Sequence, residues 1–190
     1  MSSYQVRTAE TSDAASIAEL HAASAHAAYE GVVEGKPKSP PPEQRRAFWR
    51  DAVEYGEPLV QVVLDADRIV GFVGYDRSRD PKSKPTTGEI WALYVAPAQW
   101  GRGAGLALWD AAREGLLEEG CNEVTIWIPL CNDRALRFAE LAGFKRELMI
   151  SEPGVQGILD FLSETVPEAK KAVPAQFFDD RFVRQLNSAK

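Results

Sequence analysis

The sequence has few of the residues that build disulfide frameworks and metal centres. Among its 190 residues are two cysteines, Cys121 and Cys131, and two histidines, His21 and His26. Two cysteines make neither a disulfide framework nor a metal-ligand set, so we read both as small buried hydrophobic residues in a reducing compartment. The histidines lie five positions apart, so they do not form an i, i+4 ligand pair on a helix. We therefore expect no metal.

Long hydrophobic runs and an excess of positive charge are also missing. No segment approaches the roughly 18 to 20 apolar residues that cross a bilayer, and the N-terminus lacks the charged-then-apolar pattern of a secretory signal. The chain has 22 Lys and Arg residues against 28 Asp and Glu, a net charge of −6. This balance argues against non-specific nucleic-acid binding. We expect a cytoplasmic globular protein that contacts neither membrane nor nucleic acid, with a core built from its 45% apolar residues.

Alternating and helical apolar periods predict an α+β fold with a mixed sheet. The predicted strands cover residues 4–8, 59–64, 69–75, 89–95, 124–128 and 144–150, and the predicted helices cover 11–29, 42–55, 106–117 and 132–142. The third helix is predicted to bury Leu106, Trp109, Ala112 or Arg113, Leu116 and Leu117. A last strand at 157–162 and a helix from Pro174 complete the prediction, with one domain over 1–165 and a helical extension over 166–190.

The sequence Gly101-Arg102-Gly103-Ala104-Gly105 lies between a predicted strand and a predicted helix. A helix N-terminus presents unsatisfied amides, and glycines let the backbone approach a phosphate closely. The G-x-G-x-G spacing differs from the G-x-G-x-x-G of a dinucleotide-binding turn, and no G-x-x-x-x-G-K-[ST] sequence exists in the chain. The turn alone is a weak pattern, because a tight connection explains most glycine clusters.

The residues on both sides make the pattern specific. Residues 93–106 (LYVAPAQWGRGAGL) resemble motif A of the GNAT N-acetyltransferase superfamily. Residues 132–144 (NDRALRFAELAGF) resemble motif B of the same superfamily, N-x-x-A-x-x-x-Y-x-x-x-G-F. The resemblance covers about residues 4–150 and implies a mostly antiparallel mixed sheet flanked by helices.

The resemblance also implies a function: transfer of an acetyl group from acetyl-CoA to the primary amine of a small molecule or peptide, by direct attack on the thioester. A homodimer is one possible assembly. The coenzyme contacts that it implies are Leu93, Tyr94, Val95, Trp100, Gly101, Arg102, Gly103, Ala104, Gly105, Leu106, Asn132 and Phe138.

Within this resemblance, Glu89 matches a glutamate that serves as the general base in part of the family, directly or through a water. The alternative for Glu89 is an ordinary exposed carboxylate at a strand edge. For the oxyanion, the resemblance implies a backbone amide near Val95, where the strand bulges away from its neighbour, and the amides of Leu93 and Val95 would pair with pantetheine. Asn132 would contact the coenzyme or simply cap the next helix.

Two positions depart from the family pattern. Trp100 replaces the Gln or Arg that often precedes the first glycine, and Phe138 replaces a tyrosine that protonates the departing thiolate in many members. Strand alternation points Tyr94 away from Leu93 and Val95, so it is a poor substitute for that acid. The alternative function is therefore an acyl-CoA-binding regulatory or interaction module with little or no catalysis.

Overall fold

The computed structural model describes residues 4–29, 41–129, 131–145 and 171. The chain forms two compact units: Met1–Val32 with Ser39–Arg134, and Val33–Lys38 with Ala135–Lys190. The predicted helix from Pro174 and the strand at 157–162 lie outside the described residues, and so does the predicted strand at 144–150, apart from its first two residues, which are in neither helix nor strand. The boundary at residue 165 stays a prediction.

The first unit contains a five-stranded sheet, as expected for the mixed α+β fold. Its strands are arranged in the order β1-β2-β3-β4-β5, and the first three pairings are antiparallel while β4 and β5 run parallel. The hairpin predicted around residues 65–68 joins β2 to β3. The strands are β1 (Gln5–Thr8), β2 (Leu59–Asp65), β3 (Arg68–Arg77), β4 (Thr87–Val95) and β5 (Glu123–Ile126).

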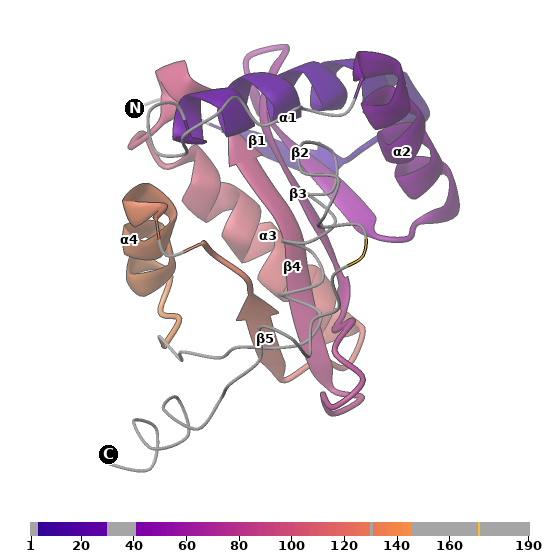
Figure 1. The fold of residues 1–190 in the computed structure, drawn as a ribbon, viewed down its shortest axis with the longest axis vertical. Coiled ribbons are helices and arrows are strands. Elements are labelled where there is room, and N and C mark those ends of the chain that lie inside the picture. Colours follow the sequence, from indigo (N-terminus) through magenta and orange to yellow (C-terminus); the bar gives the residue numbers. More distant parts are fainter. Residues whose placement is uncertain (1–3, 30–40, 130, 146–170, 172–190) are drawn as a thin grey trace. The chain divides into compact units, whose positions relative to one another are not determined.

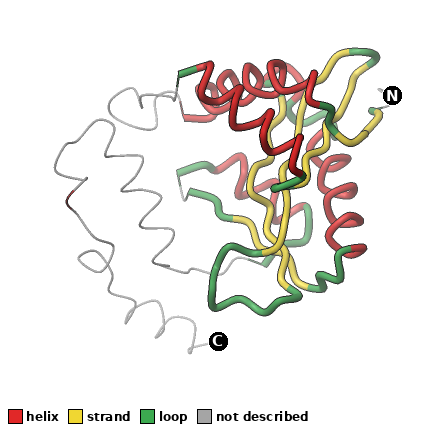
Figure 2. Tube along the Cα trace, turned by 90° about the vertical axis from the view of Figure 1, so that its right-hand side faces the viewer, coloured by secondary structure: helices red, strands yellow, loops and turns green. Residues whose placement is uncertain are grey.

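Helices cover both faces of this sheet (Figure 1, Figure 2). On one face, α1 (Ala14–Tyr29) and α2 (Pro42–Tyr55) pack on β2 and β3 around Phe72. On the other face, α3 (Ala104–Glu118) packs on the centre of the sheet. A fourth helix, α4 (Asp133–Leu141), runs from the first unit into the second. No helix among the described residues is long and apolar enough to cross a membrane.

The buried stripe of α3 agrees with the predicted apolar face only in part. The fully buried residues are Ala104, Leu108, Ala112 and Leu116, whereas Leu106 is 42% exposed and Leu117 is 67% exposed. Ala112 and Leu116 are buried as predicted, but the observed stripe repeats every four residues and alternates alanine with leucine, so it leaves out Leu106 and Leu117. The alanines let the helix approach the sheet closely enough for the leucines to fill the space between them.

A β-bulge in β4 changes which side chains share a face. Ala92 pairs with Gly74 and Ile90 pairs with Tyr75, so Trp91 is the extra residue. Before the bulge, Ile90 belongs to the core under α3; after it, Leu93 and Val95 do, while Ala92 and Tyr94 pack with α1 and α2. A regular strand would have placed residues 89, 91, 93 and 95 on the same face. The bulge therefore leaves Glu89 on the α1–α2 face.

Gly71 in β3 lies where α3 packs closely against the sheet. A Cβ added there would be 2.9 Å from Val63 Cγ1, 3.0 Å from the Tyr94 carbonyl oxygen and 3.1 Å from Leu108 Cδ1. We predict that Gly71→Ala lowers the free energy of unfolding by about 1–3 kcal/mol, because the added methyl group overpacks this site. Gly74→Ala in the same strand is the control, since its nearest neighbours would be 3.5 Å away. Equal urea midpoints for the two variants would contradict the prediction.

His21 of α1 is enclosed by aromatic rings. Its ring centroid lies 4.4 Å from that of Tyr94 and 5.8 Å from that of Trp49, whose Nε1 donates to His21 Nδ1 at 3.1 Å. Burial, with a smaller contribution from the Arg45 charge, lowers the pKa of His21 from 6.5 to about 4. An unprotonated Nδ1 is also required to accept the Trp49 hydrogen bond.

This low pKa predicts acid sensitivity. Between pH 6.5 and about 4 the unfolded chain binds a proton at His21 that the folded chain does not, so stability is present above this window and is lost as the pH falls through it. The maximal slope is about 1.4 kcal/mol per pH unit. We expect His21→Gln to flatten this part of the stability–pH curve, measured by urea unfolding, and His26→Gln at an exposed position of the same helix to leave it unchanged.

Candidate active site

Within the part of the chain that the structure describes, no strand pairs with one edge of β4 along its second half. The pairing of β4 with β5 ends at Ile90 and Ile126, whereas β4 continues to Val95. The Ala96 amide donates to the Val70 carbonyl of β3 at 2.8 Å, and backbone groups alternate in direction along an antiparallel strand. The amides of Leu93 and Val95 therefore point away from β3, toward the edge that β5 leaves open. An extended ligand can add to such an edge as a further strand.

Two side chains hold the end of this edge in place. Ser24 of α1 is buried and donates from Oγ to the Val95 carbonyl oxygen at 3.0 Å, and Trp100 donates from Nε1 to the same oxygen at 2.7 Å. The Arg134 guanidinium lies 4.2 Å above the Trp100 ring. Trp100 thus fixes the strand end rather than presenting a donor to a ligand. Nothing in the alanine-rich sequence around Ser24 indicated its role.

The glycine turn leads directly from this edge into α3. Gly101 and Gly103 have φ angles of +74° and +96°, and a Cβ at either position would meet nothing within 4 Å. The backbone conformation, and not space, therefore requires glycine here. Gly103 is the N-cap of α3, no side chain caps this end, and the first turn has no acidic residue. These first-turn amides and the helix dipole favour an anion. Arg102 and Leu106 are exposed beside them.

Tyr94, one of the predicted coenzyme residues, has its ring on the face opposite to Leu93 and Val95. Its backbone pairs with Phe72 of β3, and its ring lies on the α1–α2 face against His21 and Phe72. Burial raises the pKa of Tyr94 to about 12. As strand alternation predicted, its hydroxyl is not on the side of Leu93 and Val95, and its proton is held too tightly for an efficient acid at neutral pH.

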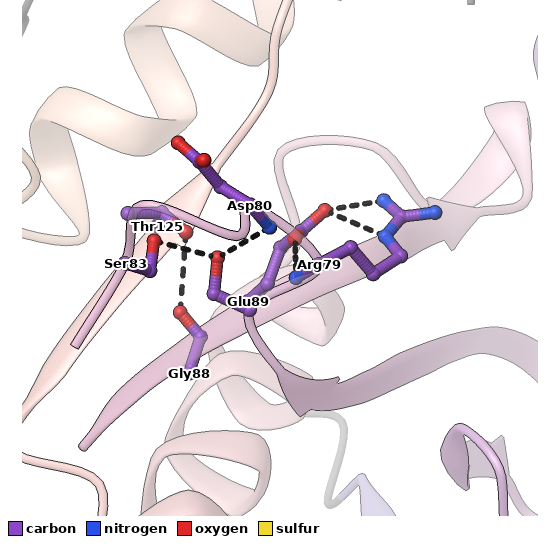
Figure 3. A network of polar contacts seen from close by, with 7 residues as sticks. Arg79, Asp80, Ser83, Gly88, Glu89 and Thr125 are labelled. Atoms are coloured by element: carbon purple, nitrogen blue, oxygen red, sulfur yellow. Dashed lines mark hydrogen bonds and ion pairs between the residues drawn. The ribbon is translucent and has the colours of Figure 1, made fainter. Parts of the chain in front are cut away.

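Glu89 is buried, so the alternative of an exposed edge carboxylate is wrong. Only 2% of its side chain is exposed, against 54% for its ion-pair partner Arg79. The Arg79 amide donates to Oε2 at 2.9 Å, and its guanidinium donates to Oε1 through Nε at 3.1 Å and through a terminal nitrogen (Figure 3). Sequence analysis missed Arg79, which lies in a polar loop with no motif of its own.

The structure also places the predicted residues Asn132, Cys131 and Phe138, which lie just before α4 or within it. Asn132 immediately precedes α4, and its Nδ2 donates to the Tyr29 hydroxyl at the end of α1 at 3.4 Å. Cys121 is buried as expected, but Cys131 is exposed, contrary to the prediction. Phe138 is partly buried in the part of α4 that belongs to the second unit, so its role at the coenzyme stays a prediction.

Comparisons with known proteins agree with this arrangement. Mycothiol acetyltransferase from Kocuria rhizophila is 35% identical over 82 residues, 43% of this chain and 27% of that protein. The enzyme of the same name from Renibacterium salmoninarum is 28% identical over 98 residues, 52% of this chain and 28% of that protein. The matched segment thus spans less than a third of either relative.

Solved structures show the same fold. Aminoglycoside N-acetyltransferase AAC(6')-Iy in complex with CoA has a TM-score of 0.63 at 15% identity, over 80% of this chain and 93% of that one. PaiA N-acetyltransferase from Thermoplasma acidophilum, in complex with coenzyme A, has a TM-score of 0.59 at 16% identity, over 77% of this chain and 93% of that one. The model of the acetyltransferase (GNAT) family matches residues 19–144. The chain belongs to the acetyltransferase (GNAT) family.

Proposed function

We propose that this chain is an N-acetyltransferase that moves the acetyl group of acetyl-CoA to a primary amine by direct attack on the thioester. The observation that carries the proposal is the continuity of two binding elements in the first unit. The open edge of β4 at Leu93 and Val95 leads within a few residues to the uncapped start of α3 at Gly103. Pantetheine amides suit the first element and a pyrophosphate suits the second.

The acceptor in this proposal is a cationic small molecule or a peptide amine. The names of the relatives support amine chemistry, because they include aminoglycoside acetyltransferases among the structures. The net charge of −6 also favours a cationic partner. A cytoplasmic location and a homodimer belong to the same proposal.

The chemistry assigns one task to each group. The Val95 amide hydrogen-bonds the thioester oxygen as it gains negative charge. Glu89 takes a proton from the amine. The strand rises roughly 13 Å from Glu89 to Leu93, which favours proton transfer through a chain of water molecules over direct contact. No acid is assigned to the thiolate, since Tyr94 faces away, and a thiol with a pKa near 8.5 leaves without one.

A coenzyme-binding module without catalysis is the second candidate. The observation that favours it is the ion pair between Glu89 and Arg79, which engages both carboxylate oxygens of the proposed base. A carboxylate oxygen can accept more than one hydrogen bond, so the pair is compatible with either function. The two candidates differ in whether thioester is consumed when an amine is present.

Two glycines with matched backbones test the coenzyme site. Gly103 and Gly120, at opposite ends of α3, both have positive φ and open space around an added Cβ. We expect Gly103→Ala and Gly120→Ala to lose similar stability, since αL costs a residue with a Cβ about 1 kcal/mol. Only Gly103→Ala should lose the thermal stabilisation by acetyl-CoA. Release of free thiol with a panel of amines then separates the enzyme from the module, and an absence of both effects contradicts the proposal.

Replacing Glu89 by glutamine tests the base. A protonated alkylamine with a pKa near 10.4 depends on a base, whereas a weakly basic arylamine is already neutral at pH 7. We expect Glu89→Gln to lower kcat for an alkylamine by about 10²-fold or more, and for an arylamine much less. The measurement is thiol release at saturating acetyl-CoA. Equal losses for both amines would remove Glu89 from proton transfer.

A further inference from the structure

Arg79 is the most unusual neighbour of the proposed site. Its guanidinium is half exposed, yet it contacts a carboxylate that is almost fully buried. An ionised carboxylate in the interior requires a partner of opposite charge. Two different parts of Arg79 provide hydrogen bonds here: the backbone amide binds Oε2, and the side chain binds Oε1 (Figure 3).

The guanidinium also lies on an aromatic ring. Its central carbon is 4.2 Å from the ring centroid of Trp91, the bulged residue of β4. The Trp91 Nε1 atom is buried and has no hydrogen-bond partner among the described residues. Organic cations bind well where a carboxylate lies beside the face of a tryptophan ring. The chain thus contains a cation site, and its own Arg79 occupies it.

The position of this site matters for the acceptor. Gly88 faces α3, because a Cβ on it would be 2.7 Å from Leu116, so Glu89 faces the opposite side of the sheet. Glu89 is also one residue before the pairing of β4 with β5 ends. Because the Arg79 side chain is 54% exposed and that of Glu89 is 2% exposed, an amine that approaches Glu89 from solvent meets the guanidinium first.

The loop that carries Arg79 is held by its own hydrogen bonds. The Ser78 and Ser83 hydroxyls lie 3.0 Å apart, and the Asp80 amide donates to Ser78 Oγ at 3.3 Å. The Ser78 amide donates to the Thr87 carbonyl of β4 at 2.9 Å. The backbone of Arg79 can thus stay on Oε2 while its exposed side chain rotates into water.

We propose that the Arg79 guanidinium is a displaceable occupant of a cation subsite formed by Glu89 and Trp91, and that an ammonium group of the acceptor binds there in exchange. The role of the acceptor rests on the proposed function. The exchange replaces one cation by another, so the buried carboxylate still has a cationic partner when the acceptor is bound. A neutral or anionic acceptor gains nothing from this subsite. The subsite therefore selects for cationic acceptors, and Arg79 weakens their apparent affinity by the fraction of time that it is docked.

Small cations test the subsite without turnover. In Arg79→Ala, methylguanidinium should raise the melting temperature in a saturable manner, while methylurea, with the same shape and no charge, should not. Arg50→Ala is the matched control, because Arg50 is 58% exposed and pairs with an exposed carboxylate, Asp51. The wild type and this control should respond to neither compound, and Arg79→Ala combined with Glu89→Gln should lose the response. If Arg79→Ala folds only when methylguanidinium is present, that result supports the subsite.

Kinetics with active protein give the second readout. Arg79→Ala should lower KM for a cationic amine, by about ten-fold if the wild-type guanidinium is undocked one tenth of the time, and leave KM for a neutral arylamine unchanged. Arg79→Lys should lower KM less, because lysine keeps the positive charge but presents one ammonium group in place of a planar guanidinium. The absence of saturable stabilisation in Arg79→Ala, or its persistence without Glu89, overturns the subsite. Stabilisation without turnover of any amine keeps the subsite and refutes the proposed function instead.

Discussion

The central constraint in this protein is that β4 has a neighbour on both sides for only part of its length. It pairs with β5 as far as Ile90, and beyond that point β3 is the only strand among the described residues that pairs with it. Backbone amides at an unpaired strand edge are strong hydrogen-bonding groups that need a partner, whether water or a ligand. The open edge, the glycine turn that follows it and the carboxylate that precedes it therefore lie along one continuous stretch of chain.

The bulge at Trp91 determines which face of the sheet the side chains of β4 occupy. It reverses the facing of the strand, so that Ile90 and Leu93 both pack under α3 although they are three residues apart. Glu89 then lies on the face that α1 and α2 cover, and the open edge lies between that face and the α3 layer. A base and a thioester binding edge can thus meet from two sides of one strand, since their side chains and backbone groups point in different directions.

The elements around the edge are held rigidly. Ser24 and Trp100 both donate to the Val95 carbonyl oxygen, so the strand end has little freedom before the turn begins. Trp100 stands where family members often have Gln or Arg, and its indole explains how the chain accommodates the change: the side chain turns inward and stabilises the strand. The Glu89 carboxylate, in contrast, is held by a side chain that is 54% exposed and that water can reach.

Much of this organisation is encoded locally. Turn glycines, apolar periods and the two motifs identified the family, the order of the strands and helices and the start of α3, because each depends on residues close together in the sequence. The backbone roles of Leu93 and Val95 remain predictions that the pairing pattern supports. The buried stripe of α3 was predicted only in part: Ala112 and Leu116 belong to it, whereas Ala104 and Leu108 were missed. An alanine carries little signal without a partner surface.

Only the tertiary structure decided the environment of Glu89. The bulge at Trp91, the burial of the carboxylate and its pairing with Arg79 all depend on contacts between β3, β4 and the loop that joins them. An arginine in a polar loop is identical in sequence whether it is solvated or docked on a buried acid, and a strand of regular alternation would have turned Glu89 toward α3. Such pairings cannot be recognised in the sequence, because they form only when the sheet brings the two backbones into register.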